Sequence, residues 1–193
     1  MKTLTEDDLL DIAAYEKVRD ERIGSVIEIK KRRRIQVGPM VTLLFENRET
    51  IRSQIQEIMR AERLVDAEAI REELDACNEL IPRENELSAT LFIEVEDPRG
   101  VRGVLDRFIG LDEEGRVVLR FESGKTIPGV FEKGHSREDR ISAVHFVRFR
   151  LDEEGARALR TGPERIELVI HHPGYEASAE IAGDIRRSLA EDL

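Results

Sequence analysis

The sequence predicts an α+β protein in which a mostly antiparallel sheet carries helices packed on one face. Helical spacing of apolar residues dominates residues 1–82, apart from one strand at about 40–46. Alternation of apolar and polar residues dominates residues 83–193, where only short helices are expected. Hydrophobic residues make up 40% of the 193 residues, so this charge-rich chain still has enough apolar surface to form a core. We expect the two halves to form one integrated domain, tied together by the strand at 40–46.

The first helix is expected to begin at Thr5. Three acidic residues follow this hydroxyl side chain, and acidic groups favour the positive N-terminal end of a helix. Apolar residues at helical spacing then predict a buried stripe formed by Leu9, Ile12, Ala13, Ile23 and Ile27. We expect the helix to end in a run of cations, which suit the negative end of the helix dipole: Lys30, Lys31, Arg32, Arg33 and Arg34.

One strand and two further helices complete the first half. Gly38-Pro39 interrupts the alternating pattern, so the strand is expected to start at about residue 40. The apolar stripes of helices at about 48–65 and 67–80 are out of phase, and Asp66 between them is a suitable N-cap. Ile81-Pro82 ends the helical half, because the residue before a proline avoids the helical conformation.

The second half is predicted to consist mainly of strands. They are expected at 87–95, 116–122, 126–131, 143–151, 165–172 and 175–181. The pair at 116–122 and 126–131 should form a hairpin through Gly124, and Pro173-Gly174 should turn the chain between the last two strands. Asp97-Pro98 opens a short helix to about 109, and further helices are expected at 152–160 and 183–192.

Charge and composition narrow the classes of function. The formal net charge is −10, which disfavours nonspecific binding of nucleic acid or anionic membrane by the whole molecule. Cys77 is the single cysteine, so neither an intramolecular disulfide nor a cysteine-ligated zinc or iron–sulfur site is expected. The acidic N-terminal segment does not resemble a signal peptide, and no apolar run reaches the roughly 18 residues that span a bilayer. We therefore expect a cytoplasmic protein.

Sequence motifs for catalysis or cofactor binding are largely missing. Gly124-Lys125-Thr126 imitates the end of a phosphate-binding loop, but Leu119 stands where that loop requires a glycine. Glu132 and His135 have the Glu-x-x-His spacing of di-iron sites, yet the Gly134 between them favours a loop over the helix that such sites need. The sequence thus assigns no reaction and leaves open whether the chain is an enzyme.

One acid and two histidines are candidates for a metal site. Helical geometry, at roughly 100° per residue, places Glu62 inside the apolar stripe of the helix at 48–65. His145 and His172 each share a strand face with aliphatic residues. A carboxylate and two imidazoles facing the core are the ligand set of many iron and zinc sites, and Glu46 or Glu57 would be further ligands. The alternative is that backbone groups or nearby arginines pair with each of these side chains.

The basic run at 30–34 and Cys77 also have two interpretations each. The run is either a solvated helix end or a site for an anion, RNA or an acidic partner protein. Cys77 lies on an apolar helix face, where a thiol usually behaves as a small buried hydrophobic group, so we do not expect it to act as a nucleophile.

Several segments together resemble a bacterial domain-of-unknown-function family of about this length. The segments are Phe45-Glu46-Asn47-Arg48-Glu49-Thr50, Gln54 to Arg63, Glu79-Leu80-Ile81-Pro82, Ser142-Ala143-Val144-His145-Phe146 and His172-Pro173-Gly174-Tyr175. Genes of that family often neighbour those of a rubrerythrin and of a heterodisulfide-reductase-like iron–sulfur protein. The resemblance therefore implies a setting of oxidative stress and electron transfer, with no established catalytic residues.

Three hypotheses of function follow. The first is a non-catalytic accessory of a redox module that docks on an iron–sulfur or rubrerythrin-like partner, consistent with the missing cofactor motifs. The second is a metalloprotein or metalloenzyme that holds iron or zinc through Glu62, His145 and His172. The third is a module that binds RNA or anions through residues 30–34. Helices with out-of-phase apolar stripes also predict a homodimer, the commonest oligomer.

Overall fold

The predicted fold class is confirmed by a computed structural model that describes residues 2–95, 97–132, 134, 136–137 and 140–193. Eight strands form one sheet in which every pair of neighbours is antiparallel. Their order across the sheet is β1 (Arg34–Val37), β2 (Val41–Glu46), β3 (Glu86–Ile93), β8 (Val144–Arg150), β5 (Thr126–Phe131), β4 (Val117–Phe121), β9 (Ile166–His172) and β10 (Tyr175–Glu180). A separate two-stranded sheet pairs β6 (Ser136–Arg137) with β7 (Arg140–Ile141). Lys133 and His135 lie outside the described residues.

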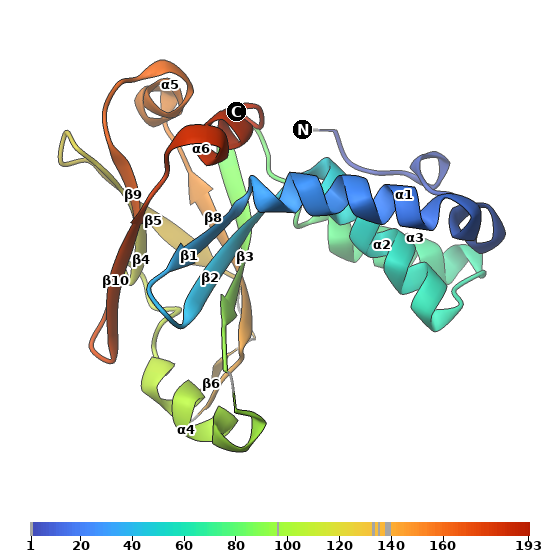
Figure 1. The fold of residues 1–193 in the computed structure, drawn as a ribbon, viewed down its shortest axis with the longest axis horizontal. Helices are drawn as coiled ribbons and strands as arrows, with labels where there is room; N and C mark the ends of the chain where they lie inside the picture. Colours follow the sequence, from blue (N-terminus) through green and yellow to red (C-terminus); the bar gives the residue numbers. More distant parts are fainter. Residues whose placement is uncertain (1, 96, 133, 135, 138–139) are drawn as a thin grey trace.

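The large sheet curls so that its two edge strands, β1 and β10, approach each other (Figure 1). The Tyr175 hydroxyl on β10 links these edges, because it donates to the Val37 carbonyl at 2.5 Å and accepts from the Met40 amide at 3.1 Å. Gly38 makes the turn between β1 and β2 with a φ of 68°. A Cβ at this position would lie 2.4 Å from the Tyr175 hydroxyl oxygen, so the close approach requires glycine.

The main hydrophobic core fills the inside of the curled sheet. It combines alternate residues of the strands with side chains from the connecting segments, among them Phe45, Leu91, Phe108, Leu119, Phe149 and Ile170. A second, smaller core lies among the N-terminal helices, where Leu4, Ile51, Ile55, Met59, Leu74, Cys77, Leu80 and Ile81 are buried together and Phe146 of β8 packs against them. The strand β2 joins the two halves of the chain because it pairs with β3 of the second half.

Three helices project together from one side of the sheet (Figure 1): α1 (Ile12–Lys31), α2 (Arg48–Glu62) and α3 (Ala67–Asn78). Each begins at an acidic or amide side chain that accepts hydrogen bonds from free backbone amides: Asp11, Asn47 and Asp66 respectively. The cap predicted at Asp66 is therefore confirmed. A short 3-10 turn, η1 (Glu6–Asp8), precedes α1.

The remaining helices lie at the two ends of the sheet (Figure 1). The segments η2 (Pro98–Gly100), α4 (Val101–Leu105) and η3 (Asp106–Phe108) lie at one end, and α5 (Glu153–Thr161) and α6 (Gly183–Ala190) at the other. The Arg186 guanidinium of α6 donates to four carbonyl groups at or just beyond the C-terminal end of α5, those of Ala158, Leu159, Gly162 and Glu164. This arrangement satisfies carbonyl groups that a helix end leaves without partners.

The prediction of a first helix from Thr5 through residue 34 is wrong at both ends. Thr5 caps only η1, and α1 starts at Ile12 with Asp11 as its cap. The chain leaves α1 after Lys31 and enters β1 at Arg34, a strand that the sequence pattern missed. The expected buried stripe also fails in part, since Ala13 is exposed and 48% of Ile27 is accessible to solvent. None of the helices in the described part of the chain combines the length and apolar character that crossing a bilayer requires.

Candidate functional site

Glu62 does not point into the core. It is the last residue of α2, and its side chain is exposed to solvent. Arg63 follows in the left-handed conformation, with a φ of 55°, and ends the helix. The helical-wheel prediction was wrong here because a stripe is buried only where another element covers it, and in this stripe the burial stops at Met59.

His145 does face the core, as its strand pattern predicted. It is only 1% exposed and lies on the same face of β8 as the buried Val147 and Phe149. Its Nε2 lies 2.8 Å from the Ser142 carbonyl oxygen, so this nitrogen donates a hydrogen bond to the backbone. The Phe131 ring meets the imidazole edge-on, with centroids 5.9 Å apart.

His172 is also buried, at the end of β9, and both of its ring nitrogens have backbone partners. The Gly174 amide donates to Nδ1 at 3.1 Å, so the ring proton resides on Nε2, which donates to the Ile109 carbonyl at 2.9 Å. A Cβ on Gly174 would lie 2.3 Å from the Arg107 carbonyl oxygen. The His172-Pro173-Gly174-Tyr175 segment therefore fastens the β9–β10 turn to the end of η3 and, through Tyr175, to β1.

Glu62, the acid of the predicted metal site, does not share the protein interior with His145 and His172. In the described part of the chain, no group of three or more histidine, cysteine or acidic side chains is arranged to hold a metal ion. Glu46 accepts hydrogen bonds from the Thr50 and Thr90 hydroxyls at 2.6 and 2.7 Å. Glu57 accepts from Tyr15 and Arg19, and the Arg19 guanidinium lowers the pKa of its carboxyl group. The two additional acids thus have protein partners of their own.

Cys77 is buried in the second core, as its helical position predicted. Burial, reinforced by a hydrogen bond to the Glu73 carboxylate at 3.1 Å, raises the pKa of the Cys77 thiol to about 12. A thiol that stays protonated at neutral pH is a poor nucleophile, so this residue serves packing.

Arg33 separates from the other cations of the basic run because its side chain is completely buried. The guanidinium donates to the carbonyl groups of Phe45, Glu46 and Ser188 and forms an ion pair with Asp192. It therefore ties the C-terminal end of the chain to the start of the sheet. The prediction that all five cations, residues 30–34, bind a ligand is wrong for Arg33.

The other four cations stay at the surface where α1 passes into β1. Lys31, Arg32 and Arg34 are exposed and Lys30 is half-buried. Lys31 forms an ion pair with Glu28, whereas no carboxylate in the described part of the chain pairs with Lys30, Arg32 or Arg34. We name this group, Lys30, Lys31, Arg32 and Arg34, the basic junction.

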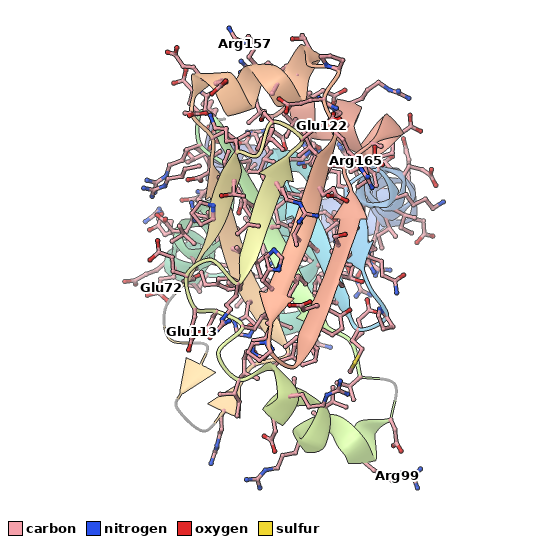
Figure 2. All side chains as sticks on the ribbon, turned by 90° about the vertical axis from the view of Figure 1, so that its left-hand side faces the viewer. Glu72, Arg99, Glu113, Glu122, Arg157 and Arg165 are labelled. Atoms are coloured by element: carbon pink, nitrogen blue, oxygen red, sulfur yellow. The ribbon has the colours of Figure 1, made fainter. Side chains whose placement is uncertain are left out.

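An apolar side chain accompanies the basic junction. Ile27, one turn before Lys31 on α1, is half-exposed, and in the whole of α1 only Tyr15 is buried. The outward face of β4, β9 and β10, which is turned to the viewer in Figure 2, is different, because charges of both signs form ion pairs there. There Glu167 pairs with Arg120 at 2.7 Å and with Arg165 at 3.1 Å, and Arg165 also reaches Glu180. The basic junction thus combines three cations that have no carboxylate partner in the described residues with an exposed aliphatic group. The sequence located its cations but not the exposure of Ile27.

Comparison with known proteins identifies the family of the chain but assigns no reaction to it. The family described as "Protein of unknown function (DUF3501)" matches residues 3–193. A crystal structure of a novel protein of unknown function from Burkholderia pseudomallei K96243 shares 37% sequence identity over 100% of both chains, with a TM-score of 0.91. No curated protein matches the chain.

Proposed function

We propose that this chain, which belongs to the DUF3501 family of proteins of unknown function, is a non-catalytic docking protein. It binds an acidic partner protein through the basic junction. The observation that carries the proposal is the set of three cations without a carboxylate partner in the described residues: Lys30, Arg32 and Arg34. They lie in a chain whose net charge is −10, so they do not belong to a general excess of positive charge.

Charge complementarity favours a protein over a nucleic acid as the partner. A phosphate polymer contacts many residues at once and would meet the acidic remainder of this chain around a patch of four cations. An acidic protein surface of limited extent matches the patch without that repulsion. Ile27 beside the patch supplies an aliphatic contact, which suits a protein interface in which apolar groups are covered together with charges.

The partner class comes from the family resemblance. An iron–sulfur or rubrerythrin-like protein carries the cofactor itself, so the chain described here would contribute binding and orientation, not electron transfer. The buried histidines and acids support this division, since each makes contacts within its own fold. We place the protein in a redox or oxidative-stress module on this basis.

The test is a binding measurement with purified proteins. Wild type is titrated calorimetrically with the rubrerythrin-like protein and with the iron–sulfur protein encoded in the same genome. We expect affinity for one of them at low salt that weakens as salt is added. The variant Lys30→Glu/Arg32→Glu/Arg34→Glu should lose this binding at every salt concentration.

A matched control variant tests whether a loss of binding comes from the basic junction itself or from the change in net charge. Lys2, Lys17 and Arg157 are exposed cations away from the basic junction, and reversing them changes the net charge by the same amount. The control variant should bind like wild type. Equal loss in both variants, no binding to either protein, or tight binding of a random RNA in place of protein would overturn the proposal.

We also propose that the protein forms a homodimer. The half-buried apolar residues Ile23 and Val26 of α1 offer area that a second copy would cover. Light scattering at micromolar concentration should give twice the chain mass of 22.1 kDa, and a value equal to the chain mass would contradict the dimer.

A further inference from the structure

The residues before α1 form a strap, residues 4–10, that is held against α2 and α3 by side chains of those helices. Asn78 of α3 accepts a hydrogen bond from the Leu4 amide at 2.8 Å and donates to the Leu4 carbonyl at 2.9 Å. Gln56 of α2 makes the same pair of hydrogen bonds with Leu10, at 2.7 and 3.0 Å. Each amide side chain therefore pairs with both backbone groups of one strap residue.

Charge and apolar contacts fit the strap to the same surface. The Leu4 side chain is only 3% exposed, because it packs in the second core. Glu6 of the strap forms an ion pair with α3 at 2.6 Å, and Asp8 forms one with α2 at 2.5 Å. This surface therefore suits an acidic segment that begins with a leucine. We name its four polar side chains the strap site: Arg48, Gln56, Arg71 and Asn78.

The chain reverses its direction between the strap and α1. The strap runs outward along the helices, and α1 runs back toward the sheet (Figure 1). Leu9 and Asp11, at the reversal, have extended backbones, with ψ angles of 149° and 160°. Opening of this reversal carries the strap away from its own strap site and leaves α1 in place.

We infer that the strap exchanges between two copies of the chain, so that each strap lies on the strap site of the other copy. A second copy carries the one segment whose fit to the strap site the structure displays, including its acidic residues and Leu4. Exchange of an identical element is a low-cost route to a dimer, because the contacts within one copy reappear between two.

An apolar surface beside the reversal favours the exchanged pair. A hollow of about 750 Å³ is lined there by residues from the start of α1 and from the end of α2, among them Ile12, Ala61 and Val65. Val65 is 79% exposed, more than any other large hydrophobic side chain in the described part of the chain. Two opened copies that meet at this end of their helices cover both valines, which a single copy leaves in water.

Cross-linking with an isotope label tests on which copy the strap lies. The variant Arg71→Lys/Arg19→Lys places one amine beside Glu6 of the strap and a second beside Glu57, which joins α2 to α1. Equal amounts of labelled and unlabelled variant are unfolded, refolded together and treated with a carbodiimide, which couples an amine to a neighbouring carboxylate. Mass spectrometry should find that about half of the cross-links between positions 6 and 71 join unlike isotopes. Those between positions 19 and 57 should all join like isotopes.

The opposite result is equally distinct. Cross-links between positions 6 and 71 that join like isotopes only, or no cross-link between them, would overturn the exchange. Light scattering of the same sample separates this outcome from the homodimer that was assigned to Ile23 and Val26. A dimer with like-isotope cross-links refutes the exchange and keeps that homodimer, whereas a monomer refutes both.

A substitution at Val65 tests the surface beside the reversal. Changes in the strap site affect both arrangements equally, so the informative variant is Val65→Asp, which places a charge where two copies meet. It should lower the fraction of unlike-isotope cross-links at least about tenfold. Val130 of β5, which is 54% exposed, supplies the matched control, and Val130→Asp should leave that fraction unchanged. Circular dichroism confirms that both variants are folded, and equal fractions in the two would contradict the role of Val65.

Discussion

The contact between the two edges of the sheet depends on Gly38, which lies in the turn between β1 and β2 beside Tyr175. Its positive φ and the Tyr175 hydroxyl beside it leave no room for a side chain. We expect Gly38→Ala to lower the free energy of unfolding by about 1–3 kcal/mol, because alanine is strained in this conformation and displaces Tyr175. Chemical denaturation followed by circular dichroism measures the change.

Gly24 provides the matched control for that substitution. It lies within α1, and a Cβ there would meet no atom within 4 Å. Gly24→Ala should therefore raise the free energy of unfolding by about 0.5–1 kcal/mol, the usual gain for a helix interior. A loss of stability at Gly24 equal to that at Gly38 would contradict the role given to the β1–β2 turn.

Cys77 should be unreactive in the folded protein. With the pKa of its thiol raised to about 12, less than about a thousandth of the thiol is ionised at pH 8, and the thiolate is the reactive form. A disulfide reagent such as dithionitrobenzoate should detect no thiol in native protein and one per chain in denaturant. Rapid reaction of the native protein would mean that the second core opens readily.

The burial of the two candidate histidines was predictable from the sequence, whereas their hydrogen-bond partners were not. Strand alternation placed His145 and His172 inside correctly, because side chains of a strand alternate between faces. Their partners, the Ser142 and Ile109 carbonyls, are backbone atoms that sequence patterns do not display. The position of Glu62 depended on which turns of α2 are covered, and that is decided by tertiary packing.

At the scale of elements, Arg33 and Asp192 join α6 and the C-terminal residues to the β1–β2 pair. Arg33→Met should lower the free energy of unfolding by about 3–5 kcal/mol, since it leaves the Asp192 carboxylate buried without its partner. Denaturant titration measures this loss. A loss below about 1 kcal/mol would show that the pair does not hold the C-terminal segment in place.

The same pair predicts a dependence on pH. Burial raises the pKa of the Asp192 carboxyl group from its ordinary 3.8 to about 6, although Arg33 opposes the shift. Between these two pH values the folded state binds more protons at this group than the unfolded state, so its contribution to stability falls as pH rises. Asp192→Asn should therefore remove a decline in stability between pH 4 and 6, seen as the difference between the variant and wild-type curves. Parallel curves would contradict the assignment.

Most elements were predictable where a local signal coincided with a periodic pattern. Asp66 at the start of α3 marked a helix boundary through its side-chain oxygens. The hairpin of β4 and β5 followed from alternation on both sides of Gly124. Such signals are contained within a few residues, so tertiary contacts were not needed to recognise them.

The missed elements depend on contacts between distant segments. β1 contains only four residues, and its pairing with β2 is visible only after the Gly38 turn is formed against Tyr175. The end of α1 was placed too late because the cations after Lys31 suited a helix terminus electrostatically. The helix instead ends at Lys31, and Arg33 is buried among atoms of β2 and α6. Within the candidate site, the sequence identified the cations, but only the fold distinguished the buried Arg33 from the four at the surface.

At the scale of the whole molecule, the basic junction is a positive surface on a chain whose net charge is −10. The outward face of β4, β9 and β10 pairs its charges across strands, and the net charge of −10 repels most anionic partners. At the basic junction, where α1 passes into β1, three cations have no carboxylate partner in the described residues, so this surface can attract an anionic partner. Association should therefore depend on salt and be directed to this surface.

Hydrogen exchange of the complex with the bound redox partner tests this location most directly. Backbone amides of residues 26–37, which span the end of α1 and the whole of β1, are followed with and without the partner by mass spectrometry. The docking account predicts that exchange slows in this segment and stays unchanged in β9 and β10. Slowing confined to the β9–β10 face or to α4, with residues 26–37 unaffected, would contradict it.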